Sequence, residues 1–170
     1  MEGKEKRAKE AMSYFCTKPS NFPKGRPLNC CETVLQTLEE ELKIESDVIP
    51  RIGTGIGAGV SLNGLLCGSI SGEAMIVGMI HGRNTSEEDP TKTWSMVDEF
   101  LQAFQHRFTY TTCRELTGVN VKTPEGMKQY YERIHDYSCA DRVRFAVEKT
   151  LEILTEIGRA SCRERVLSVV

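Results

Sequence analysis

The residues of this chain best suited to chemistry are its cysteines, of which there are seven among 170 residues. Four of them stand in separate segments, at Cys30, Cys67, Cys113 and Cys139. A cysteine thiolate is a nucleophile in disulfide exchange and a ligand for soft metals, so both kinds of chemistry are open to such a group. No C-x-x-C pair occurs, so the fold must assemble any site from distant segments.

Two interpretations apply to each of these cysteines. Helices are expected to begin close to Cys30, Cys67 and Cys139, where the positive end of the helix dipole and free N–H groups stabilise a thiolate. Cys113 falls in a short turn and is followed by Arg114, which either lowers the pKa of that thiol or pairs with a carboxylate. The alternative for every cysteine is packing, because the free thiol behaves as a small hydrophobic group.

The hydrophobic pattern predicts helices and shows no sustained alternation typical of a strand. Asn29 and Glu32 are spaced as a capping box at the start of one helix. A further helix is expected near residues 91–108, and the last helix is expected to begin near Ser138. The helix that starts at this capping box has apolar residues at Leu28, Cys31, Leu35, Leu38 and Leu42. The helix near residues 91–108 has an apolar face of Trp94, Val97, Leu101, Phe104 and Phe108.

A glycine-rich segment, RIGTGIGAGVSLNG, covers residues 51–64. It lacks the G-x-G-x-x-G spacing and a preceding strand, which favours a tightly turned connection over a nucleotide-binding loop. In the helix expected over residues 65–81, Gly64, Gly68 and Gly72 form a stripe against which another helix can pack closely. Together these elements predict an all-α fold, a compact single-domain bundle of five to six helices.

The charge and hydropathy of the chain limit the classes of partner that we expect it to bind. The net charge of -2 gives no basic surface for nucleic acid. The N-terminal residues 1–12 are charged throughout and lack the apolar core of a signal peptide. The longest apolar run, LLCGSISGEAMIVGMI, is short for a membrane span and contains Glu73. We therefore expect a soluble cytoplasmic protein that inserts into no membrane and binds no nucleic acid, in which structural disulfides are disfavoured.

The C-terminal residues 156–170 do not resemble the rest of the domain in sequence. The run EIGRASCRERV, from Glu156, resembles the translation of a sequencing adapter, and Gly158 is expected to interrupt the preceding helix there. We therefore expect residues 1–155 to form the domain and residues 156–170 to be an artefactual tail, disordered or loosely helical. The alternative is a natural C-terminal helical turn. Setting the tail aside removes Cys162 from the candidate site.

Four motifs surround the selected cysteines, namely NCCETVL, GIGAGVSLNGLLCGSISG, TTCRELTG and SCADRV. In order, spacing and local context they resemble the C-GCAxxG-C-C family of redox-active proteins, across about residues 28–154. Ser69 replaces the usual alanine in the C-G-A-x-x-G element. Cys31 stands at the alanine position of the N-C-A element, which leaves open whether Cys30 or its neighbour acts.

The resemblance implies redox activity that depends on these four cysteines, and some family members carry selenocysteine. A similar domain accompanies a multihaem cytochrome, for which an iron–sulfur centre is suggested. This chain has no C-x-x-C-H motif for covalent haem attachment. No substrate follows from the family, and the oligomeric state stays open.

Three functions compete. The leading hypothesis is a thiol redox protein, in enzymatic form a thiol oxidoreductase, which acts on a redox partner protein or a small oxidant without a cofactor. In it, Cys67 and Cys139 form the reactive centre, with Cys30 and Cys113 close by. The second is an electron carrier or sensor in which the same four thiolates bind zinc or an iron–sulfur cluster. The third is a helical binding module whose cysteines pack the core.

The remaining candidates are expected to be structural. The three histidines are scattered without the spacing of metal ligands, and we expect them at the surface or in capping roles; they are His81, His106 and His135. Cys16 and Cys31 lie outside the family pattern and are expected to pack.

Overall fold

The computed structural model describes residues 2–22 and 24–167, and it confirms the all-α class. Five helices are long and two are short, and within the described residues the only β-type pairing is one isolated bridge. The α-helices are α1 (Glu2–Cys16), α2 (Cys30–Leu42), α3 (Gly68–His81), α4 (Thr91–Phe108), α5 (Cys113–Thr117), α6 (Pro124–Gln129) and α7 (Ala140–Leu167). A 3-10 helix, η1 (Arg51–Ile56), and a π-helix, η2 (Tyr130–Cys139), complete the chain.

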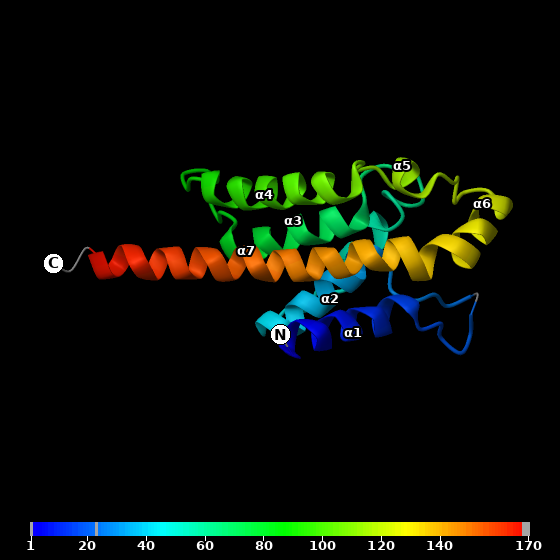
Figure 1. Cartoon of the computed structure of the whole chain (residues 1–170), viewed down its shortest axis with the longest axis horizontal. Coiled ribbons are helices and arrows are strands. Elements are labelled where there is room, and N and C mark those ends of the chain that lie inside the picture. The colour runs from blue at the N-terminus through cyan, green and yellow to red at the C-terminus, as the bar shows by residue number, and fades with distance from the viewer. Residues whose placement is uncertain (1, 23, 168–170) are drawn as a thin grey trace.

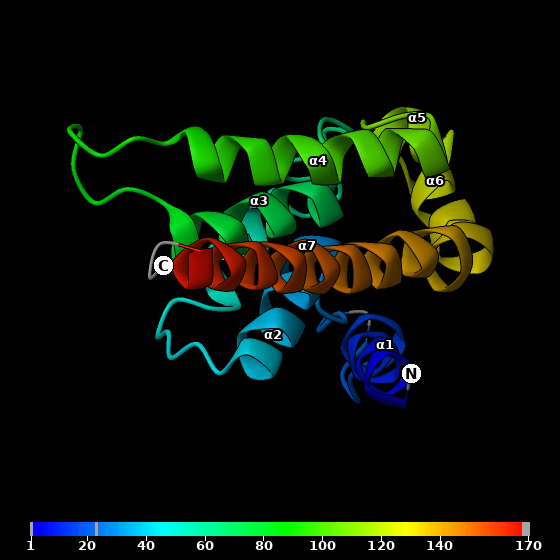
Figure 2. The ribbon, with the colours of Figure 1, turned by 60° about the vertical axis from the view of Figure 1, so that its left-hand side comes forward.

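The long helix α7 is the axis around which the other helices gather. Figure 1 shows α3 and α4 on one side of it and α1 and α2 on the other, and Figure 2 shows the same order from a second direction. The core between these helices is apolar and closely packed, with Leu35, Ile76, Phe100 and Val143 all fully buried. No helix among the described residues is both long enough and apolar enough to cross a membrane.

Helix α2 begins as its sequence predicts. The Asn29 side chain accepts from the backbone N–H groups of Cys31 and Glu32, and the Glu32 carboxylate accepts from the Asn29 N–H at 2.8 Å. This reciprocal pair satisfies backbone donors that a helix start leaves free. The capping box therefore fixes where Cys30 enters the helix.

The glycine stripe brings α3 against α2. A Cβ atom at Gly72 would contact the Cys31 carbonyl oxygen and the Val34 side chain, and a Cβ atom at Gly68 would overlap the Cys30 Sγ. Glycine at these two positions therefore allows the close approach that the sequence predicts. Gly64 does not extend the stripe, because it precedes the helix and adopts a φ of 75°.

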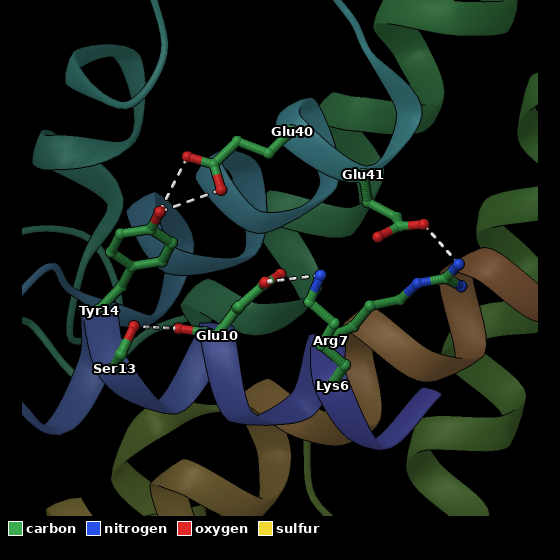
Figure 3. A network of polar contacts seen from close by, with 7 residues as sticks. All are labelled: Lys6, Arg7, Glu10, Ser13, Tyr14, Glu40 and Glu41. Carbon is green, nitrogen blue, oxygen red and sulfur yellow. Dashed lines mark hydrogen bonds and ion pairs between the residues drawn. The ribbon is translucent and has the colours of Figure 1, made fainter. Parts of the chain in front are cut away.

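Helix α1 is tied to α2 by polar contacts at the surface, as Figure 3 shows. The Tyr14 hydroxyl lies 2.9 Å from one carboxylate oxygen of Glu40, and Arg7 forms an ion pair with Glu41. These contacts hold α1 beside α2, and Phe15 near the end of α1 is 1% exposed.

Two local predictions differ from the structure. The buried face of α4 is formed by Met96, Phe100 and Phe104, whereas Trp94 is 65% exposed. Val97, Leu101 and Phe108 of the expected face are partly buried and pack against the core. Packing against α3 and α7 therefore extends the expected face to Met96 and Phe100 and leaves Trp94 outside it.

The last helix has no separate start near Ser138, because α6, η2 and α7 follow one another without a break. The backbone of α7 also continues through Gly158 to Leu167, while residues 168–170 of the expected tail lie outside the described residues. That the segment from Glu156 is artefactual stays a prediction.

Candidate functional site

The four cysteines selected from the sequence line a single small cavity, which we call the cysteine cavity. Its volume is about 10 Å³, roughly enough for one water molecule. Chemistry inside it must therefore occur between the thiols themselves. The lining residues are Cys30, Ala58, Cys67, Ser69, Cys113, Leu116, Thr117, Tyr130, Cys139 and Arg142.

A short antiparallel contact holds Cys67 near Cys113. Leu66 and Thr112 form the isolated bridge, and the residues that follow them begin α3 and α5. The Cys67 N–H donates to the Thr111 carbonyl at 2.8 Å, and the Cys113 N–H donates to the Leu65 carbonyl at 2.6 Å. Two segments far apart in sequence are thus joined at the cavity by backbone hydrogen bonds.

Cys30 is placed by the start of α2 and by a left-handed turn opposite it. Residues 58–62 all have positive φ, between 51° and 70°, although only Gly59 among them is a glycine. Such a run is unfavourable for L-residues and requires support from its surroundings. Here the Leu65 N–H donates to the Gly59 carbonyl at 3.0 Å, and the Ala58 N–H lies close enough to favour a Cys30 thiolate. The glycine-rich segment is therefore a tight turn that forms one wall of the cavity.

A buried arginine supplies positive charge at the other wall. Arg142 is 8% exposed, and its Nη1 lies 3.5 Å from the Cys139 Sγ. Its Nη2 donates to the Leu116 carbonyl at 2.7 Å, which fixes the guanidinium in place. Sequence reasoning missed this residue, although its signal was present: Cys139 and Arg142 are three residues apart and therefore share a helix face.

Burial decides the protonation of all four thiols. It raises the pKa of Cys139 to about 11 and that of Cys113 to about 12, and it raises the pKa values of Cys30 and Cys67 as well. The expectation of thiolates stabilised at helix starts is therefore wrong for the protein at rest, because desolvation outweighs the dipole. Cys139 in addition lies within a continuous helix rather than at a start, whereas Cys113 does begin α5.

Electrostatic interactions couple Cys67 to the other three thiols. A charge on Cys67 raises the pKa values of Cys30, Cys113 and Cys139 alike. Hydrogen bonding from the Ser69 backbone N–H lowers the pKa of the Cys67 thiol, and the Arg142 guanidinium lowers it further. Ionisation of Cys67 therefore makes each of the other three thiols harder to deprotonate.

A second and larger cavity opens beside the cysteine cavity, and we call it the entrance pocket. Its volume is about 430 Å³, within the range of small-ligand sites. Cys30, Ala58 and Tyr130 line both cavities, whereas Cys67, Cys113 and Cys139 line only the inner one. Cys30 is therefore the thiol at the junction between the two.

The other candidate residues lie outside the cysteine cavity. Cys31 is fully buried with its Sγ 3.8 Å from the Met75 sulfur, and Cys16 is half-buried, so the structure places both outside the cysteine cavity. His135 corrects the expectation of a surface role, since it is 4% exposed and stacks on Phe15 with ring centroids 4.1 Å apart. Arg114 lowers the pKa of Cys113, but Arg142 does so more strongly.

Within the described part of the chain, no group of three or more His, Cys, Asp or Glu side chains is arranged to hold a metal ion. The zinc or iron–sulfur alternative therefore finds no support in the positions of these four sulfur atoms.

A helical bundle that gathers four thiols from separate segments around one cavity is suited to thiol redox chemistry. The chain belongs to the family described as "Putative redox-active protein (C_GCAxxG_C_C)", whose model matches residues 28–153. The matched range contains all four cysteines of the cavity. Comparison with curated proteins and with solved structures found no match.

Proposed function

We propose that this protein is a thiol–disulfide redox carrier in which Cys30 receives the oxidising equivalent and Cys67 resolves it. The observation that carries the proposal is the shared position of Cys30, which lines both the entrance pocket and the cysteine cavity. An oxidant in the entrance pocket can meet Cys30, while the inner volume of about 10 Å³ admits no substrate.

The co-reactant in this scheme is a disulfide. The Cys30 sulfur attacks one sulfur of the substrate disulfide, and the first substrate thiol departs with the proton that Cys30 loses. Cys67 then attacks the Cys30 sulfur of the mixed disulfide, and the second substrate thiol departs with the proton of Cys67. Two electrons have passed from the cysteine pair to the substrate, and a Cys30–Cys67 disulfide remains.

Groups around the cavity support the thiolates that this exchange needs. The Ser69 backbone N–H and the Arg142 guanidinium lower the pKa of Cys67. Arg142 also lowers the pKa of Cys139, and a hydrogen bond from Tyr130 lowers it further. These influences oppose the larger effect of burial, so the thiolates form only transiently near neutral pH. Cys113 and Cys139 are placed to receive the disulfide from Cys67 in a further exchange. The pairing of Cys67 with Cys139 expected from the sequence is one such product.

A redox titration of the full chain tests the proposal. The protein is equilibrated with mixtures of reduced and oxidised dithiothreitol, and its free thiols are counted by alkylation and mass spectrometry. We expect two thiols to disappear together in one two-electron transition, with a slope of about 30 mV per tenfold change in ratio. Cys67→Ser should abolish this transition, whereas Cys16→Ser, outside the cavity, should retain it. An unchanged transition in Cys67→Ser would refute the proposal.

A further inference from the structure

The entrance pocket is built to hold a small molecule against Cys30. One wall is aromatic and is formed by Phe15, Tyr130, Tyr131 and His135. These rings pack on one another, with the Tyr131 and His135 centroids 5.2 Å apart. A rigid aromatic wall offers apolar contact area at little cost in conformational entropy.

The charges of the pocket favour an anion. Its lining contains two cations, Lys24 and Arg26, and one carboxylate, Glu32. Within the described residues, neither cation has an ion-pair partner, whereas both oxygens of Glu32 are engaged, by the Asn29 N–H and the Thr54 hydroxyl. His135 adds little positive charge, because burial lowers its pKa. Two exposed cations that line a pocket and have no ion-pair partner among the described residues attract carboxylates.

The position of Cys30 determines which thiol a ligand in the entrance pocket can react with. Cys30 is the only one of the four cavity cysteines that lines the entrance pocket, so a ligand bound there has one thiol to react with. Ser61 and Leu62 of the left-handed turn also line the pocket, and Ala58 of that turn lies beside Cys30.

We propose that the entrance pocket binds a small organic disulfide that carries carboxylate groups, with Lys24 and Arg26 as its anion-binding residues and Cys30 facing its sulfur atoms. This inference rests on the proposed function and names its substrate class. The reaction is the exchange given above, in which the bound disulfide leaves as two thiols and the Cys30–Cys67 disulfide forms.

Three disulfides of similar size and different charge test the inference: dithiodiglycolate (anionic), hydroxyethyl disulfide (neutral) and cystamine (cationic). The full chain is mixed with each, and mass spectrometry follows the rate of mixed-disulfide formation at Cys30. Each rate is divided by that of the same reagent with the urea-unfolded chain, which removes differences in intrinsic reactivity. We expect dithiodiglycolate to exceed hydroxyethyl disulfide by about tenfold and cystamine to be slowest, with the differences shrinking as salt is added.

Charge removal supplies the control. The double variant Lys24→Gln/Arg26→Gln should lose the anion preference, whereas Arg83→Gln, in the exposed loop before α4, should keep it. Equal normalised rates for the three reagents, or a preference that the double variant retains, would overturn the inference. Failure of the proposed function is a separate result: the mixed disulfide at Cys30 would form with the expected charge order but would never pass to Cys67.

Discussion

A buried carboxyl group in α3 makes the stability of this protein depend on pH. Glu73 is 0% exposed, and neither of its carboxylate oxygens has a hydrogen-bond partner among the described residues. Burial raises its pKa from 4.5 to about 8. Because the folded pKa lies above the unfolded one, the native state holds a proton that the unfolded chain releases between these values. The free energy of unfolding must therefore fall as pH rises from 4.5 to about 8.

The size of the effect follows from linkage. Each pH unit within this window costs about 1.4 kcal/mol, so the wild-type protein should lose about 3 kcal/mol between pH 4.5 and pH 7 through Glu73 alone. Glu73→Gln removes the titrating group and keeps the shape of the side chain. The variant should lie within about 1 kcal/mol of the wild type near pH 5 and exceed its stability by about 3 kcal/mol near pH 7.

Urea unfolding under reducing conditions, at pH 5 and pH 7, measures this difference. Glu87→Gln is the matched control, because Glu87 lies in an exposed loop. It should shift the unfolding free energy by less than about 0.5 kcal/mol at both pH values. A Glu73→Gln variant whose stability relative to the wild type is the same at both pH values would refute the reasoning.

Two further predictions concern the packing and charge of the cysteine cavity. Gly68→Ala should lower the free energy of unfolding by about 2 kcal/mol, because its Cβ would overlap a thiol of α2. At Gly78, in the same helix, a Cβ atom meets open space, so Gly78→Ala should raise the free energy of unfolding by about 1 kcal/mol. Urea titrations measure both variants, and equal effects would contradict the close packing of Gly68 against α2. Arg142→Met should raise the pKa of Cys139, since a nearby cation is lost; the ultraviolet absorbance of the thiolate during a pH titration, compared with that of Cys139→Ser, measures the shift. Arg144→Met, exposed on the same helix, should leave that pKa unchanged, and the same shift in both variants would indicate a general disturbance of α7.

Local signals in the sequence predicted the fold well where a few neighbouring residues determine the structure. The capping box of Asn29 and Glu32 is such a case, because its hydrogen bonds join residues three apart. The buried face of α4 depends on other helices, and so Trp94 was misplaced. Ser138 and Asp141 resemble a helix start, yet η2 continues into α7 without one. Capping residues indicate a start only when the preceding residues do not already form a helix.

In the candidate site, too, local motifs could be predicted from the sequence, whereas properties of the assembled fold could not. The identity of the four cysteines followed from their motifs, and the structure brings them to one cavity. Their ionisation did not follow, because burial is a property of the assembled fold and exceeds the effect of helix position on every thiol. The sequence does not establish that Arg142 lies at the cavity or that the entrance pocket exists, because both depend on segments that meet only after folding. The spacing of Cys139 and Arg142 was the one local sign of that arrangement.

The most direct test of the central claim is to identify the disulfide that forms first. The reduced full chain is exposed briefly to a limiting amount of dithiodiglycolate, quenched with acid, alkylated and digested, and its cross-linked peptides are mapped by mass spectrometry. The proposed exchange predicts that Cys30 is linked to the reagent first and to Cys67 next, with Cys16 and Cys31 remaining free. A first disulfide that does not include Cys30, or a mixed disulfide at Cys30 that Cys67 does not displace, would contradict it.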